Sequence, residues 1–316
     1  MAKTKEISRR IKSVSSTKKI TKAMEVVAAA KMRKAIEAVL KTRTYANLSW
    51  ETVLHLAKLE KSHSESLHPL LTPRKTINKV AIILITSNRG MCGGYNTAVI
   101  NKAKESIENH PVPTDFILVG KKGSIVHRQN YNVVAEFPKS DILTDSLEIN
   151  PIVKMVLSDY ANKKYDKILV AYTDFVNPAK QIPRVKQLVP VEIETIDEYL
   201  GVVGESEQIS VTKEIIDEKE KKHLTDENYS YEYTFEPSPS EVLDMMIPRL
   251  VEIQLYQAFL EANASEHSAS MTAMHQATEA ASDMISELTL FYNKARQAGI
   301  TAEIAEISAG ANALAE

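Results

Sequence analysis

The chain of 316 residues contains little cysteine, glycine or aromatic side chain. Cys92 is the one cysteine, so a disulfide or a cysteine-ligated zinc site within the chain is excluded. Nine glycines and an aromatic content of 6% favour a structure rich in closely packed helices. No run of about 18 consecutive apolar residues occurs, so no segment is predicted to span a membrane. A formal net charge of −2 gives no overall field that favours nucleic acid or acidic lipid.

Residues 5–60 also lack proline and glycine, and they predict one long helix. Their apolar residues recur at spacings of three and four, as on one face of a helix. That predicted face contains Ile7, Ile11, Val14, Ile20, Met24, Val27, Leu48, Leu56 and Leu59. At a rise of about 1.5 Å per residue, the helix is roughly 80 Å long.

The pattern changes between Ile77 and Tyr199. Apolar runs of strand length occur at 80–85, 116–119 and 167–172, and amphipathic stretches at 97–109 and 147–163 lie between them. Strands that alternate with helices predict a Rossmann-like parallel sheet with crossover helices. A charged stretch at about 201–228 predicts a surface excursion or a short exposed helix. The alternating aromatic residues that follow at 229–235 predict an edge strand.

A second long helix is predicted at the C-terminus. Ser238 before an acidic first turn is a helix start signal, and only Pro248 and Gly299 interrupt the stretch that ends near Ser308. We therefore expect three domains: a helix at 1–62, an α/β domain at 63–237 and a helix at 238–316. Since a helix of about 68 residues spans roughly 100 Å, it should project from an α/β domain about 35 Å across.

The two terminal segments carry opposite charge. Residues 1–43 hold thirteen basic and three acidic residues, a net charge of +10, whereas residues 240–316 hold eleven acidic and three basic residues, a net charge of −8. Opposite charges along an apolar seam favour pairing of the two helices. The sequence therefore predicts that the N- and C-terminal helices form an antiparallel coiled coil.

No catalytic, cofactor-binding or metal site is predicted. The glycine-rich turn at 88–96 follows a strand, but Tyr95 stands where a phosphate-binding loop needs lysine, and the dinucleotide-binding pattern is absent. We expect a tight turn there, a strand-to-helix turn at 120–124, and a buried, unreactive Cys92. The eight histidines have no recognisable metal-ligand spacing.

Three motifs resemble the F-type ATP synthase gamma subunit family. They are KKITKAMEVVAAAKMR at 18–33, RGMCGGYN at 89–96, similar to the family's R-G-L-C-G-G-x-N, and YNKARQAGIT at 292–301. The order of the motifs also matches, and the resemblance covers almost the whole chain.

This resemblance implies a non-catalytic rotor shaft without a cofactor. In the family, the coiled coil turns inside a ring of alternating alpha and beta subunits, and the globular foot contacts the epsilon subunit and the membrane c-ring. The resemblance implies contacts with the ring at Met24, Arg249, Gln297 and Thr301. Because no leader precedes Lys5, we expect a bacterial protein on the cytoplasmic face of the cell membrane, where the membrane contact is indirect, through the c-ring.

Two other classes remain open from the residues alone. One is an α/β enzyme with helical extensions, which would need a ligand at the strand ends. The other is a coiled-coil scaffold with an α/β domain, or a nucleic-acid adaptor that uses the basic N-terminal helix. Nucleic-acid binding is not expected, because the basic segment has no aromatic residue before Tyr45.

Overall fold

The computed structural model describes residues 2–63, 68–74, 76–141, 146–191 and 239–315. They form two compact units. We call residues Met1–Ala29 and Ser270–Glu316 the helical unit, and residues Ala30–Ala269 the α/β unit. The predicted excursion at 201–228 and the predicted edge strand at 229–235 lie outside the described residues.

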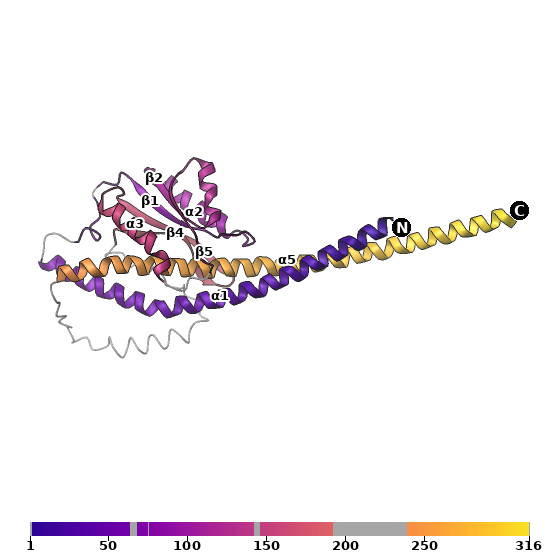
Figure 1. The fold of residues 1–316 in the computed structure, drawn as a ribbon, viewed down its shortest axis with the longest axis horizontal. Coiled ribbons are helices and arrows are strands. Elements are labelled where there is room, and N and C mark those ends of the chain that lie inside the picture. Colours follow the sequence, from indigo (N-terminus) through magenta and orange to yellow (C-terminus); the bar gives the residue numbers. More distant parts are fainter. Residues whose placement is uncertain (1, 64–67, 75, 142–145, 192–238, 316) are drawn as a thin grey trace. The chain divides into compact units, whose positions relative to one another are not determined.

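Two long helices form the first and the last part of the described chain (Figure 1). α1 spans Ala2–His63 and α5 spans Pro239–Ala315, and Pro248 lies inside α5. Each helix begins in one unit and ends in the other. The predicted long terminal helices are therefore confirmed.

A five-stranded sheet forms the centre of the α/β unit, with the strand order β3-β2-β1-β4-β5. The pairs β1–β2, β1–β4 and β2–β3 are parallel, and β4–β5 is antiparallel. The predicted α/β fold is confirmed, and the sheet is mixed. The strands are β1 (Val80–Ile85), β2 (Thr114–Val119), β3 (Asn132–Phe137), β4 (Lys167–Asn177) and β5 (Lys180–Val189).

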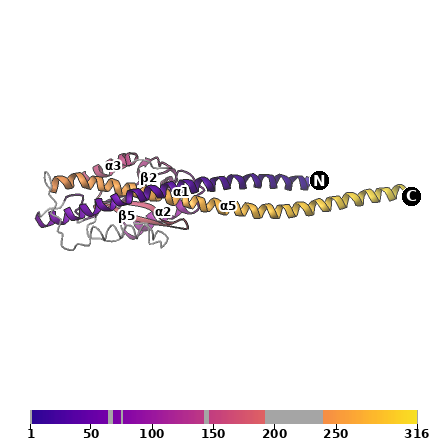
Figure 2. The same ribbon diagram turned by 90° about the horizontal axis from the view of Figure 1, so that it is seen from below.

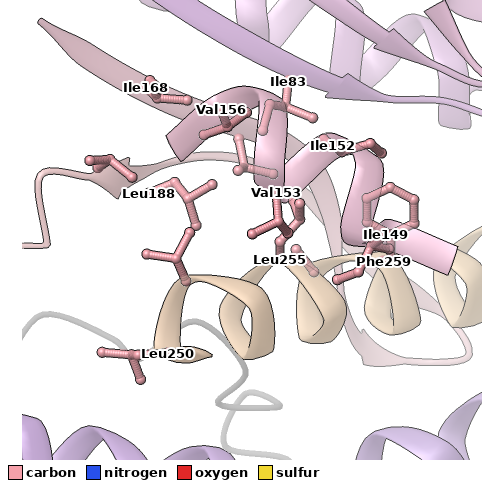
Figure 3. Close-up of a cluster of buried hydrophobic side chains, with 14 of the residues drawn as sticks. Ile83, Ile149, Ile152, Val153, Val156, Ile168, Leu188, Leu250, Leu255 and Phe259 are labelled. Carbon is pink, nitrogen blue, oxygen red and sulfur yellow. The ribbon is translucent and has the colours of Figure 1, made fainter. Parts of the chain in front are cut away.

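Helices cover both faces of this sheet, so β1 is buried along its whole length. One face is covered by α2 (Tyr95–Asn109) and the 3-10 helix η1 (Lys121–Gln129). The other is covered by α3 (Asn150–Ala161), the short 3-10 helix η2 (Ser146–Ile149) and α5. Figure 3 shows this second core, in which Leu255 and Phe259 of α5 pack near Ile152 and Val153 of α3.

The sequence analysis did not predict β5. Its residues, KQIPRVKQLV, have no continuous apolar run, and Pro183 argues against a central strand. At the edge of a sheet proline is tolerated, because one side of the strand needs no ladder hydrogen bonds. The turn before β5 is built by Asn177, whose side-chain oxygen accepts hydrogen bonds from the backbone N–H of Ala179 (2.9 Å) and Lys180 (2.8 Å).

Candidate functional site: the paired terminal helices

In the helical unit, the side chains of α1 that are shielded from solvent follow a heptad pattern. Besides the partly buried Ser15, Met24 and Ala29, the covered positions of α1 recur at alternating spacings of three and four, which is the pattern of a coiled-coil seam. These positions are Thr4, Ile7, Ile11, Val14, Lys18, Thr21, Glu25 and Ala28.

α5 has a matching seam in the same unit. Besides the partly buried Ser270, Ala273, Ala277 and Ser282, its covered positions follow the same alternation over more than three heptads. They are Met271, Met274, Thr278, Ala281, Ile285, Leu288, Tyr292 and Ala295.

Two side-chain contacts fix how the seams meet. The Thr21 and Thr278 hydroxyl oxygens lie 2.8 Å apart, and His275 Nδ1 lies 3.4 Å from Glu25 Oε1. A later residue of α1 thus contacts an earlier residue of α5, so the two helices are antiparallel. Figure 2 shows them side by side. The predicted antiparallel coiled coil of the terminal helices is confirmed.

Part of the predicted apolar face was wrong. Ile20 and Val27 are 60% and 56% exposed, and the seam passes through the polar residues Thr21 and Glu25 instead. The heptad that starts at Ile7, Ile11 and Val14 continues to positions 18, 21 and 25, whatever residues stand there. The sequence analysis assigned Ile20 and Val27 to the buried face because they are apolar and suitably spaced. The heptad period of the coiled coil, however, decides which positions of α1 face α5.

The opposite charges of the two segments are not matched by a ladder of direct ion pairs in the described contacts. Arg10 pairs with Glu6 at 3.0 Å, and Lys22 pairs with Glu25 at 2.9 Å, and both pairs lie within α1. Exposed pairs of this kind contribute about 0–1 kcal/mol each. We infer that complementary charge acts between the helices mainly as a general attraction, while the seam stabilises the pair.

The C-terminal end of α5 extends past the seam. Given the contact of Thr21 with Thr278, Thr4 lies opposite Ala295, and residues 296–309 are all exposed. Three of them, Ile300, Ile304 and Ile307, are large apolar residues spaced as on one face of a helix. This exposed stripe was not predicted, although its spacing of four and three was a detectable signal.

The seam supports a first prediction. Leu288→Ala should destabilise the helical unit by roughly 1 kcal/mol, less than the ~2–5 kcal/mol typical of a fully buried leucine, because Leu288 is only partly buried. Hydrogen exchange of the α5 amides should speed up accordingly. Leu290→Ala is the matched control, since Leu290 is 70% exposed and should change exchange little. Equal effects of both substitutions would contradict the assigned seam.

A family model described as ATP synthase matches residues 3–314. The gamma chain of ATP synthase from Herpetosiphon aurantiacus is 38% identical over 323 residues and covers 99% of both chains. The gamma chain from Coxiella burnetii is 39% identical over 324 residues and covers 99% of this chain and 100% of its own. The chain belongs to the ATP synthase gamma chain family.

Solved structures with a similar fold include chains of two mitochondrial ATP synthases. One comes from the Euglena gracilis OSCP/F1/c-ring assembly in rotational state 3, with a TM-score of 0.62, 16% identity, and coverage of 99% of this chain and 95% of that one. The other comes from the Tetrahymena thermophila central stalk and c-ring, with a TM-score of 0.58, 20% identity, and coverage of 82% and 99%. At these identities, the similarity shows a shared fold.

Three of the four predicted contact residues of this gamma chain lie in the helical unit. Met24 is partly buried beside the seam, whereas Gln297 and Thr301 are exposed on successive turns of α5. The Thr301 hydroxyl donates to the Gln297 carbonyl at 3.0 Å. By the register of the pair, Met24 lies about 30 Å from Gln297 along the helices. The structure therefore brings Gln297 and Thr301 together and leaves Met24 apart from them.

Arg249, the fourth predicted residue, lies in the α/β unit. Its guanidinium is 2.5 Å from Glu252 Oε2, and this contact raises the pKa of Arg249 above its usual value. The arginine side chain is 52% exposed, whereas that of Glu252 is 12% exposed. Arg249 is thus held by its own helix and still presents part of its side chain at the surface.

The glycine-rich turn of the gamma chain is held by hydrogen bonds between Ser87 and Asn96. Ser87 N–H donates to Asn96 Oδ1 at 2.9 Å, and Asn96 Nδ2 donates back to Ser87 Oγ at 2.7 Å. Gly93 has φ +55°, which confirms the predicted tight turn. Cys92 is 2% exposed, as predicted, and burial raises the pKa of its thiol.

Within the described ranges, no group of three or more His, Cys, Asp or Glu residues is placed to hold a metal ion. None of the helices described, α1 and α5 included, has a stretch long and apolar enough to cross a membrane.

Proposed function

We propose that this gamma chain is the central rotor shaft of an F-type ATP synthase. It would couple ion-driven rotation of the c-ring to conformational change of the catalytic beta subunits, and would catalyse nothing itself. The main support is the antiparallel pair of terminal helices, since two packed helices resist bending and twisting better than one. Stiffness is the physical requirement for passing torque along the chain.

The exposed apolar residues of the helical unit favour a surrounding partner. Ile20, Val26 and Val27 on α1 are all more than half exposed, and so is the stripe at Ile304 and Ile307 on α5. Contiguous apolar surface on a soluble protein usually marks an interaction site. We propose that the ring of alpha and beta subunits covers these surfaces, with Met24, Gln297 and Thr301 among the contacts and Arg249 as a further contact.

Coupling in this proposal arises from asymmetry. α1 is basic and α5 is acidic, so the pair presents different charge on different sides. Three chemically identical beta subunits around one such rod meet three different surfaces. Each beta subunit is then biased toward a different conformation, because a contact shifts a conformational equilibrium only when it differs between states.

The α/β domain expected at 63–237 would serve as the foot of the rotor. We propose that residues 63–237 bind the epsilon subunit and the c-ring, and that residues 1–62 and 238–316 form the shaft. The contact with the membrane would then be indirect, through the c-ring, at the cytoplasmic face of a bacterial cell membrane.

Co-purification tests this proposal. The full chain, expressed in its own cells with an affinity tag, should capture alpha, beta and epsilon subunits in stable proportion. Capture should persist in moderate salt, because apolar burial supplies most of the contact. Recovery of the chain free of all three subunits, or bound to nucleic acid in a steeply salt-dependent manner, would favour the scaffold or adaptor classes instead.

Gln297→Ala tests the proposed contact of α5 with the ring. Loss of one side-chain hydrogen bond, about 0.5–1.5 kcal/mol, should reduce ATP-driven ion pumping in vesicles by roughly two- to tenfold. The thermal stability of the isolated chain should not change, because Gln297 is exposed. Gln276→Ala, a substitution of an exposed glutamine on the same helix, is the control. Unchanged pumping by Gln297→Ala would count against the contact.

A further inference from the structure

The β4–β5 hairpin presents polar side chains to α5 in the interior of the α/β unit. Tyr172 and Asp174 lie on the same face of β4, two residues apart, and Arg184 of β5 is the register partner of Tyr172. Tyr172 and Asp174 are 0% and 3% exposed. On α5, Glu261 lies against this face and is fully buried. Two carboxyl groups thus occur in the core of a unit that is otherwise largely apolar.

Glu261 has few donors within reach. Its Oε1 accepts one long hydrogen bond from Gln257 Nε2, at 3.4 Å, and its buried Oε2 has no hydrogen-bond partner. Gln257 is itself engaged, since its Oε1 accepts from the Thr42 hydroxyl of α1 at 2.8 Å. A carboxylate buried without a full set of donors is strongly disfavoured, so this site favours the neutral acid.

Asp174 is held differently. Its Oδ2 lies 3.0 Å from Arg184 Nε, so a cation on the neighbouring strand stabilises its ionised form. Asp174 and Glu261 are neighbours, and the charge of Asp174 disfavours a second charge on Glu261, so a single proton on one of the two carboxyls is favoured. Since the guanidinium favours charge on Asp174, the proton belongs on Glu261, which becomes the donor.

We propose that Glu261 is protonated at neutral pH and donates this proton to Asp174, so that one shared proton fastens α5 to the β4–β5 hairpin. Loss of the proton would place two carboxylates side by side and weaken the contact between α5 and the β4–β5 hairpin. This inference goes beyond the rotor function and rests only on contacts within the α/β unit. It can therefore fail while the rotor proposal stands, and the reverse also holds.

The charged and titratable groups around Glu261 support the assignment. β4 contributes Asp174 and Tyr172, and β5 contributes Arg184 and Lys186. α5 contributes Gln257, which connects to Thr42 of α1. Burial raises the pKa of Glu261 most, the charge of Asp174 raises it further, and Lys186 opposes them, with a result of about 8.

The direction of the pH dependence follows from this pKa. A group with a folded-state pKa above its unfolded value contributes stability that is complete below the unfolded pKa, here the ordinary 4.5. That stability is lost as the pH rises through the folded-state pKa near 8. The α/β unit should therefore lose stability between about pH 5 and pH 8, whereas paired carboxylates lose stability toward acid.

Infrared spectroscopy of the full chain tests the proposal directly. A protonated carboxylic acid has a carbonyl stretch well separated from that of a carboxylate. At pH 7 we expect a band for a protonated glutamate, assigned by selective labelling of glutamate with carbon-13, and we expect it to disappear at alkaline pH. In Glu261→Gln this band should be missing. In Glu306→Gln, which neutralises an exposed glutamate on the same helix, it should remain.

Thermal unfolding supplies a second measurement. Between pH 5 and pH 8 the melting temperature of the wild-type chain should fall by about 5 °C or more, since 1 kcal/mol corresponds to roughly 2–4 °C for a unit of this size. Glu261→Gln should lose at least half of this pH dependence, because an amide cannot ionise. Glu306→Gln should behave as the wild type.

Three results would overturn the proposal. They are the absence of a protonated glutamate band in the wild type at pH 7, a band that persists in Glu261→Gln, and an equal pH dependence of melting in both proteins. The wild-type spectrum decides the question even if Glu261→Gln does not fold.

Discussion

Phe259→Ala is expected to lower the free energy of unfolding of the α/β unit by about 3–5 kcal/mol. Phe259 is 2% exposed and lies in the core between α5 and the sheet, near Ile149 and Ile152 (Figure 3). Removing the ring loses its transfer free energy and leaves a cavity, because the surrounding helices and strands can close only part of the space. Urea unfolding followed by circular dichroism would measure the change.

Phe291→Ala is the matched control for this substitution. Phe291 lies on the same helix and is 51% exposed, so its replacement should change the free energy of unfolding by no more than about 0.5 kcal/mol. The same residue type on one helix thus gives two very different outcomes, according to what the helix packs against. Comparable losses in the two variants would contradict the placement of Phe259 in the core.

Lys139→Met is expected to cost about 3–5 kcal/mol, although the new side chain is similar in length and apolar. The Lys139 side chain is 1% exposed, and its Nζ lies 2.5 Å from Glu266 Oε2 on α5. Nζ also lies 5.7 Å from the centre of the Tyr95 ring. Without the ammonium, Glu266, whose side chain is 13% exposed, keeps a charge in a site with little water. Chemical denaturation of the full chain would measure the loss.

The double variant Lys139→Met/Glu266→Gln separates the charge effect from the packing effect. If the unpaired carboxylate causes the loss, neutralising it should recover at least half of the stability that Lys139→Met removes. Lys102→Met provides a second comparison, because Lys102 pairs with Glu105 on the exposed surface of α2 and contributes about 0–1 kcal/mol. A double variant no more stable than Lys139→Met would assign the loss to packing.

The pair of Lys139 and Glu266 also connects α5 to the region of the glycine-rich turn at 88–96. Asn88 Nδ2 of the turn donates to the Lys139 carbonyl at 2.5 Å, and the Tyr95 hydroxyl donates to the Ala262 carbonyl at 3.1 Å. These contacts lie beyond the carboxyl ends of β1 and β3, and doubly wound α/β folds bind ligands at that edge of the sheet. In this chain α5 packs there.

The sequence by itself determined the two long helices, the buried strands and the family. Residues 5–60 have no helix breaker, and the strand at 80–85 is an apolar run that needs cover on both faces. These signals are local, since they depend on backbone preference and on the period of apolar residues. The three motifs at 18–33, 89–96 and 292–301 were enough to indicate the gamma chain family.

Only the tertiary structure decided which residues meet. The supercoil placed Thr21 and Glu25 in the seam and left Ile20 outside, because the phase of a heptad depends on the partner helix. Residues 180–189 lack a continuous apolar run, and they form a strand at the edge of the sheet, where such a run is not required. The packing of α5 against β4 brought Glu261 to Asp174, far apart in sequence. Such contacts depend on distance in space and on the exclusion of water, and neither is encoded in local spacing.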